Sequence, residues 1–75
     1  MNKQLLMSVL AKNGHKQSDL AKLLCLSLSR TNAKINETDG AQFNQNEIAV
    51  IKSNYKLTAK DIDEIFLPKK YLNKI

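Results

Sequence analysis

Residues 23–30, LLCLSLSR, decide the fold of this chain because they allow two incompatible secondary structures. From Leu24 to Ser29 apolar and polar side chains alternate, which is the period-two pattern of a half-buried β-strand. Within the longer stretch 17–36, QSDLAKLLCLSLSRTNAKIN, the same residues can instead end one short helix, form a turn and begin a second helix. The fold class depends on which interpretation holds.

The helical interpretation of this stretch is the more consistent one. A strand needs a partner for its backbone groups, and no other segment of the chain offers a convincing one. Ser27 is a good N-cap for a second helix, and Leu26 would fill the turn before it. The inward positions of that helix would be Ile35 together with Leu28 or Thr31. The apolar stripe of the first helix comprises Leu20, Ala21, Leu23 and Leu24.

The first residues of the chain also carry the start and end signals of a helix. Asn2 can cap this helix, and Gly14 is placed to end it in the left-handed conformation. Apolar residues recur between them at the helical spacing of three and four: Leu5, Leu6, Val9 and Leu10. The segment between Lys3 and Lys12 is too short and too polar to span a membrane, so we expect neither a transmembrane segment nor a signal peptide.

Two further helices are predicted in the second half of the chain. Asn44 and Glu47 have the spacing of a capping box, in which each side chain satisfies the other residue's backbone donor. Thr58 and Asp61 repeat this device, and Pro68 would stop the last helix. The expected core-facing residues are Ile48, Ile51, Ile62, Ile65 and Phe66, with Val50 as a further candidate. The sequence thus predicts an all-α fold, a compact bundle of about five short helices.

The composition limits the classes of function. The 75 residues include 12 Lys and Arg against 7 Asp and Glu, a net charge of +5 that favours polyanionic partners. A single Cys and a single His cannot build a zinc site or an internal disulfide, so we expect no metal or other cofactor, and the reducing cytoplasm as the simplest compartment. Cys25 is expected to be a buried small residue and His15 to lie in the loop between the first two helices.

The sequence offers no support for an enzyme. It contains no glycine-rich phosphate loop and no nucleophile paired with a base, and no paired acids lie in an apolar setting. Asp61, Asp63 and Glu64 fall in the first turns of a predicted helix, where negative charge suits the helix dipole. We therefore expect a binding protein without a small-molecule substrate.

The stretch 17–36 resembles the twenty-residue helix-turn-helix of the Cro and repressor proteins of temperate bacteriophages. That family has Gln at the first place of the motif, Ala at the fifth, apolar residues at the eighth and tenth, and often Ser at the eleventh. The matching residues here are Gln17, Ala21, Leu24, Leu26 and Ser27. The resemblance extends over residues 2–67 to a subgroup of small regulators from Gram-positive phages and prophages, which includes modulators of repression. It implies a helix-turn-helix domain over 1–67 in the cytoplasm of a bacterial host.

Two positions depart from the family pattern. The ninth place, where the turn needs positive φ and the family has Gly, is occupied by Cys25, at a cost on the order of 1 kcal/mol. The fifteenth place, where the family has Val or Ile, is occupied by Thr31. Both departures predict lower stability and modest affinity.

The resemblance implies that residues 27–36 form a recognition helix for the major groove of double-stranded DNA. Leu28 could contact a thymine methyl group, Ser29 could exchange hydrogen bonds with a base, and Arg30 could bind guanine or a phosphate. Asn32 is expected to make a bidentate contact with adenine, and Asn36 to reach a base or a phosphate.

The expected phosphate contacts come from residues around the motif: Lys12, Lys16, Gln17 and Lys34. About five such contacts per subunit predict that log K falls with log salt at a slope of roughly −4 to −5.

The resemblance leaves two binding functions open. The first is a Cro-like or repressor-like regulator that binds operator DNA, expected as a homodimer. The second is a modulator of repression that forms a heteromer with a partner repressor, in which Leu28 meets protein instead of thymine. The basic tail, residues 68–75, carries three Lys with Tyr71, Leu72 and Ile75 among them. We expect it to be frayed or loosely docked, with phosphate binding and an intersubunit strand as alternatives.

Overall fold

Helices account for most of the part of the chain that the computed structural model describes, residues 1–67; the predicted tail and the Pro68 stop lie outside it. Within those residues there is no strand, and no helix is long and apolar enough to cross a membrane. The elements in chain order are α1 (Lys3–Lys12), α2 (Gln17–Leu23), α3 (Leu28–Asn36), the short 3₁₀ helix η1 (Thr38–Gly40), α4 (Gln45–Asn54) and α5 (Ala59–Phe66).

The stretch 23–30 forms the end of α2, a turn and the first residues of α3, so the helical interpretation is confirmed and the strand is excluded. Cys25 adopts a left-handed conformation with φ of 57°. The N–H of Leu26 then returns to the carbonyl of Ala21 at 2.9 Å, which satisfies a carbonyl near the end of α2. Ser27 Oγ accepts a hydrogen bond of 3.1 Å from the N–H of Arg30 and caps α3.

The predicted helix boundaries are confirmed at the other ends as well. Asn2 caps α1, and Gly14 follows that helix with φ of 69°. Complete capping boxes start α4 and α5, formed by Asn44 with Glu47 and by Thr58 with Asp61. These local devices explain why five short helices begin and end where they do.

A single apolar core joins all five α-helices. Its buried residues are Leu6, Leu10, Leu20, Ile35, Phe43, Ile51, Tyr55 and Ile65. Of the two candidates for the inward position early in α3, Thr31 is fully buried and donates its hydroxyl to the carbonyl of Ser27 at 3.0 Å, whereas Leu28 is 47% exposed. Val50, a further candidate for the core, is 40% exposed, because it lies one residue and about 100° around α4 from buried Ile51. The placement of Val50 in the core was therefore wrong.

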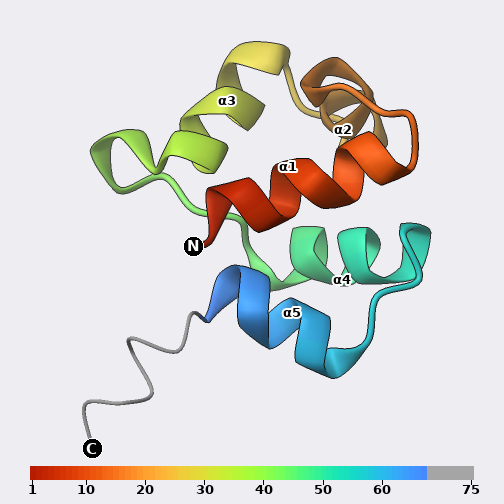
Figure 1. Ribbon diagram of the computed structural model, residues 1–75. Coiled ribbons are helices and arrows are strands. Elements are labelled where there is room, and N and C mark those ends of the chain that lie inside the picture. The colour runs from red at the N-terminus through yellow and green to blue at the C-terminus, as the bar shows by residue number, and fades with distance from the viewer. Residues whose placement is uncertain (68–75) are drawn as a thin grey trace, which may run out of the picture.

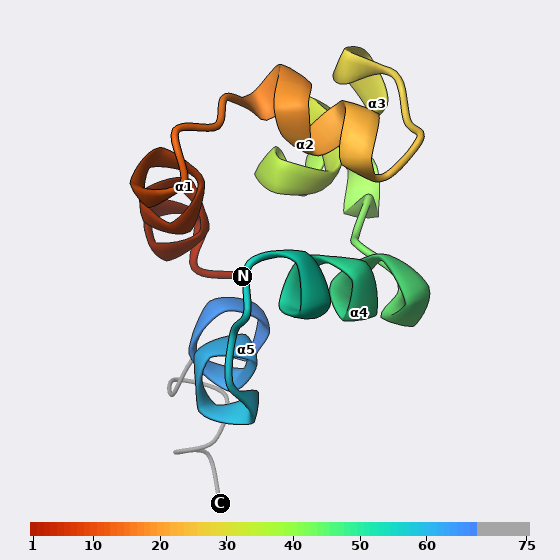
Figure 2. The same cartoon turned by 90° about the vertical axis from the view of Figure 1, so that its right-hand side faces the viewer.

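The helices divide into two groups, with α1 running alongside both of them. α2 and α3 lie together at one end of the molecule, while α4 and α5 lie at the other (Figure 1). The turned view has the same division, with α1 beside both pairs (Figure 2). The N–H of Asn2, just before α1, donates to the carbonyl of Ile65 in α5 at 2.6 Å and ties the start of the chain to its last helix. The first turn of α3 lies at the end of the molecule opposite α5 (Figure 1).

Candidate nucleic-acid interface

The first turn of α3 is the most exposed part of the α2–α3 pair. Leu28, Ser29 and Arg30 are all exposed there, immediately after the Ser27 cap. Leu28 is one of three large apolar side chains that are exposed within residues 1–67, together with Val50 and Leu67. The three side chains that the sequence assigns to base edges in this turn are therefore free to meet a partner.

Arg30 and Lys34 lie one turn apart on the side of α3 that faces the start of α4. Lys34 Nζ donates to both carboxylate oxygens of Glu47, at 2.7 and 2.8 Å, and the two side chains are only 13% and 12% exposed. Burial alone would raise the pKa of Glu47, but the hydrogen bonds from Lys34 and from the N–H of Asn44 outweigh burial, so the pKa is lowered. The positive charge of Arg30 adds to this lowering of the pKa of Glu47.

This pairing changes the role expected of one of the two cations. Lys34 is partly buried and its charge is matched by Glu47, so it is poorly placed to bind a phosphate. Arg30 is exposed, so both of its expected roles, with guanine or with a phosphate, stay open.

The two asparagines of α3 are held differently. Asn36, at the last position of the helix, is exposed, and its Oδ1 accepts a hydrogen bond of 2.6 Å from Lys3 Nζ. Asn32 is half-buried, and its Oδ1 is covered by protein without a hydrogen-bond partner among the described residues. Asn32 and Asn36 lie one turn apart on α3, on the C-terminal side of its exposed first turn.

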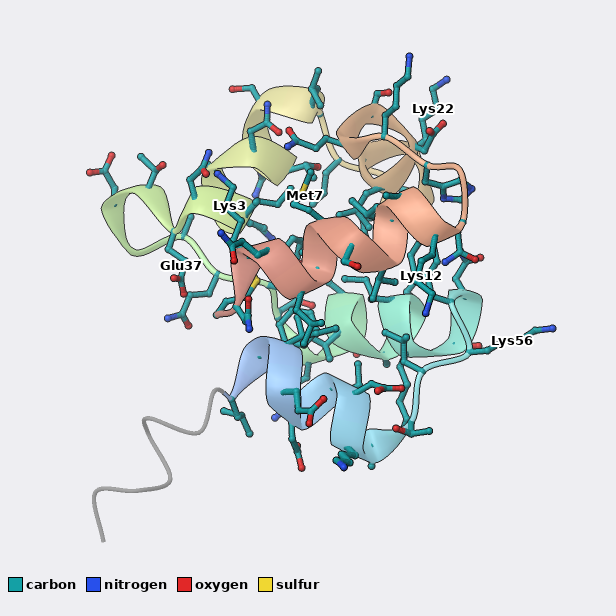
Figure 3. The ribbon with its side chains drawn as sticks, in the orientation of Figure 1. Lys3, Met7, Lys12, Lys22, Glu37 and Lys56 are labelled. Atoms are coloured by element: carbon teal, nitrogen blue, oxygen red, sulfur yellow. The ribbon has the colours of Figure 1, made fainter. Side chains whose placement is uncertain are left out.

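The remaining residues assigned to phosphates do not lie together. Lys16 is exposed immediately before α2, and the Nε2 of Gln17 is turned toward Met7 Sδ at 3.7 Å. Lys12 points to the α4–α5 side of α1 (Figure 3), where it lines a shallow surface hollow with Asp61. Lys16 and Gln17 thus belong to the α2–α3 end, whereas Lys12 does not.

Two lysines that the sequence analysis did not assign to phosphates lie at or beside the α2–α3 pair. Lys22, in the last turn of α2, is exposed and projects from the α2–α3 end of the molecule (Figure 3). Lys3 reaches α3 through its bond to Asn36, 33 positions along the chain. The helical spacing of α2 could have indicated Lys22, but no local pattern could have linked Lys3 to Asn36.

The single cysteine lies in a turn and the single histidine in a loop. Cys25 is exposed, so its expected burial was wrong; it occupies the outside of the turn between α2 and α3. His15 lies in the loop after α1, as expected, with its Nδ1 2.8 Å from the hydroxyl of Tyr55. Burial raises the pKa of Tyr55, and the negative charge of Asp19 raises it further.

Comparison of the chain with protein-family models, with curated proteins and with solved structures finds no match. The chemistry of the α2–α3 end must therefore carry any functional conclusion.

Proposed function

We propose that this protein is a phage-type or prophage-type transcriptional regulator that binds operator DNA through α2 and α3 as a helix-turn-helix. The observation that carries the proposal is the left-handed backbone of Cys25, with φ of 57°, at the place where the resembling family has glycine. This conformation by itself marks a helix end, since Glu37 after α3 and Lys56 after α4 adopt it too. What supports the motif is that Cys25 adopts it at the ninth place of the segment 17–36, directly before the capped start of α3. The exposed residues at the start of α3 follow this loop directly and act, in this proposal, as the recognition element.

In the proposed complex the first turn of α3 enters the major groove. Leu28 packs on a thymine methyl group and Ser29 exchanges a hydrogen bond with a base edge. Arg30 binds a phosphate, and Lys16 and Lys22 bind phosphates at the two ends of α2. One such helix buries too little surface for tight binding, so two copies bind half-sites about one helical turn of DNA apart.

The salt dependence of binding tests this proposal. Purified protein is titrated by fluorescence anisotropy into duplexes tiled across the DNA that flanks its gene, at several salt concentrations. Three exposed cations at the α2–α3 end predict a slope of log K against log salt of about −3 per subunit. This is shallower than the slope expected from the sequence, because Lys34 is paired with Glu47 and Lys12 lies on another side.

Matched variants locate the interface. Lys22→Ala should make the slope shallower by about one and weaken binding to all duplexes alike. Lys60→Ala, which removes an equally exposed lysine from α5, should leave binding unchanged. Binding without salt dependence, or equal effects of the two variants, would contradict the proposal.

A second candidate function is favoured by Leu28, whose exposed side chain also suits contact with another protein. In that case the chain modulates a partner repressor. The same titration, repeated in the presence of the candidate partner repressor, separates the two functions. A modulator changes the binding of the repressor and binds DNA weakly on its own, and Leu28→Ala abolishes that change.

A further inference from the structure

An open groove lies where the C-terminal end of α5 meets the end of α3 and the start of α4 (Figure 1). Its cavity volume is about 540 Å³, in the range of pockets that bind drug-sized ligands. Phe43 and Phe66 pack edge to face beside it, with ring centroids 6.0 Å apart. Ile48, Ile62 and Phe66 line the groove and keep part of their surface in water. Residues 1–67 therefore leave this apolar surface without a full cover.

The edge of the groove is polar and carries one accessible carboxylate. Glu37, directly after α3, lines this edge, and its side chain is 43% exposed, with the ammonium group of Met1 3.5 Å away. Lys34 also lines the groove, but its charge is matched by Glu47. The groove thus suits a segment with several apolar side chains on one side and a lysine that can reach Glu37.

The chain itself leaves the described residues at this groove. Leu67 lines the groove, is 54% exposed and has already left the helical conformation, with φ of −127° and ψ of 71°. This backbone is typical of a residue before proline, and Pro68 follows. The next residues therefore start at the edge of the groove and do not continue the axis of α5. The eight residues 68–75 reach at most about 26–29 Å when extended.

We propose that residues 68–75, PKKYLNKI, dock in this groove of their own chain and cover it with Tyr71, Leu72 and Ile75. The spacing of these three residues places them on one side of a helical turn, and the three Lys and Asn73 on the other sides. A tether that starts at the groove gives the segment a local concentration in the millimolar range, which favours its own groove over that of a second copy. The docked segment joins the end of α5 to the end of α3, whether or not α3 binds DNA.

Nuclear Overhauser effects (NOEs) between methyl groups of the full-length protein test the proposal. In a sample with labelled Ile and Leu methyl groups, Leu72 and Ile75 should show NOEs to the methyl groups of Ile48 and Ile62. These contacts join the segment directly to the apolar lining of the groove. Absence of all of them would mean that the groove is left to another occupant, and would overturn the proposal.

An equal mixture of labelled and unlabelled protein identifies whose groove is occupied. An isotope-filtered spectrum of this mixture detects only NOEs between different chains. We expect no NOE between the segment 68–75 and the groove in that spectrum, because both belong to one chain. Their appearance there would show that the segment docks in a second copy, which contradicts docking within the chain.

Variants of the segment measure what its docking contributes. Leu72→Ser combined with Ile75→Ser removes two apolar side chains from the cover, so the methyl signals of Ile48 and Ile62 should shift. The thermal midpoint of this double variant should fall by about 5 °C. Asn73→Ser alters the polar side of the same segment and should change neither the signals nor the midpoint. None of these substitutions touches the core of residues 1–67, and circular dichroism verifies the fold. Equal midpoints in the double variant and in Asn73→Ser would overturn the proposal.

Discussion

Lys34 on α3 and Glu47 on α4 form a partly buried ion pair, with Lys34 Nζ 2.7 Å from Glu47 Oε1. The same oxygen accepts a hydrogen bond of 3.0 Å from the N–H of Asn44, which starts α4. One carboxylate therefore caps α4 and also fixes the proposed recognition helix to it.

Replacing Glu47 by Gln should isolate the contribution of this ion pair. Glutamine keeps the ability to cap α4 but leaves the ammonium group of Lys34 partly buried without its counter-charge. We expect a loss of about 1–3 kcal/mol in the free energy of unfolding, measured by urea denaturation. Glu64→Gln, at an exposed position on α5, should change it by less than about 0.5 kcal/mol. Equal losses in the two variants would refute a specific role of the pair.

Acid should weaken the fold through two capping carboxylates. The pKa of Glu47 is lowered for the reasons given above, and the hydrogen bonds from the N–H and hydroxyl of Thr58 lower the pKa of Asp61. A carboxyl group whose pKa is lower in the folded state stabilises it above the unfolded pKa, near 4. That stability is lost as pH falls through the folded pKa values. Urea midpoints should hold from pH 7 to 5 and fall below pH 4, less steeply in Glu47→Gln; a midpoint that is flat to pH 3 would contradict this.

Tyr55 should make the folded state less stable at alkaline pH. Its pKa is raised by burial and by Asp19, so the folded state favours the neutral phenol. The resulting stability is complete below the unfolded pKa, near 10, and is lost as pH rises through the folded value. Tyr55→Phe should cost about 1 kcal/mol at pH 7, because His15 loses its hydrogen bond, and should flatten the alkaline decline. Thermal unfolding between pH 7 and 11 measures both effects, and an equally steep decline in the variant would exclude Tyr55 as its cause.

The fold was predictable because its signals are local. Each capping box lies within four residues, and Ser27 marks the start of α3 by the same kind of short-range hydrogen bond. The apparent strand pattern at 24–29 is produced by a helix end, a turn and a cap in succession. Residue type and spacing are sufficient to predict structural features that depend on residues only a few positions apart.

The details of the candidate interface were not predictable, because they depend on residues far apart in the chain. Lys3 meets Asn36 across 33 positions, and Lys34 meets Glu47 across 13. Each contact engages a side chain that the motif alone would assign to DNA. The sequence left Leu28 and Thr31 as alternatives for the buried position. Thr31 takes it, because its hydroxyl donates to a carbonyl of the preceding turn and is thereby satisfied inside the protein.

Leu28 and Ile35 should respond differently to truncation. Ile35 is buried in the core, so Ile35→Ala should cost about 2–5 kcal/mol of unfolding free energy. Leu28→Ala should change stability by less than about 0.5 kcal/mol, because much of its side chain is already in water. Chemical denaturation gives both values, and the same Leu28 variant should bind duplex DNA more weakly than the unmodified protein. A large stability loss in Leu28→Ala would mean that this side chain belongs to the core.

Replacing Cys25 by Gly should stabilise the protein. A left-handed conformation costs a residue with a Cβ atom about 1–2 kcal/mol, and glycine avoids this cost. Glycine also gains freedom in the unfolded chain, which offsets about 0.5–1 kcal/mol, so the net gain should lie between zero and about 1.5 kcal/mol. Because Cys25 is exposed, no buried contact is lost.

Cys25→Ala is the matched control, since it removes the thiol but keeps the Cβ atom. It should leave the free energy of unfolding close to that of the unmodified protein, and Cys25→Val should lower it, because a β-branched residue tolerates positive φ least. The order Gly, Ala, Val in thermal midpoint is expected if the turn between α2 and α3 keeps its left-handed residue. If Gly and Ala are equally stable, the backbone at this position is not left-handed, and the main support for a helix-turn-helix is lost.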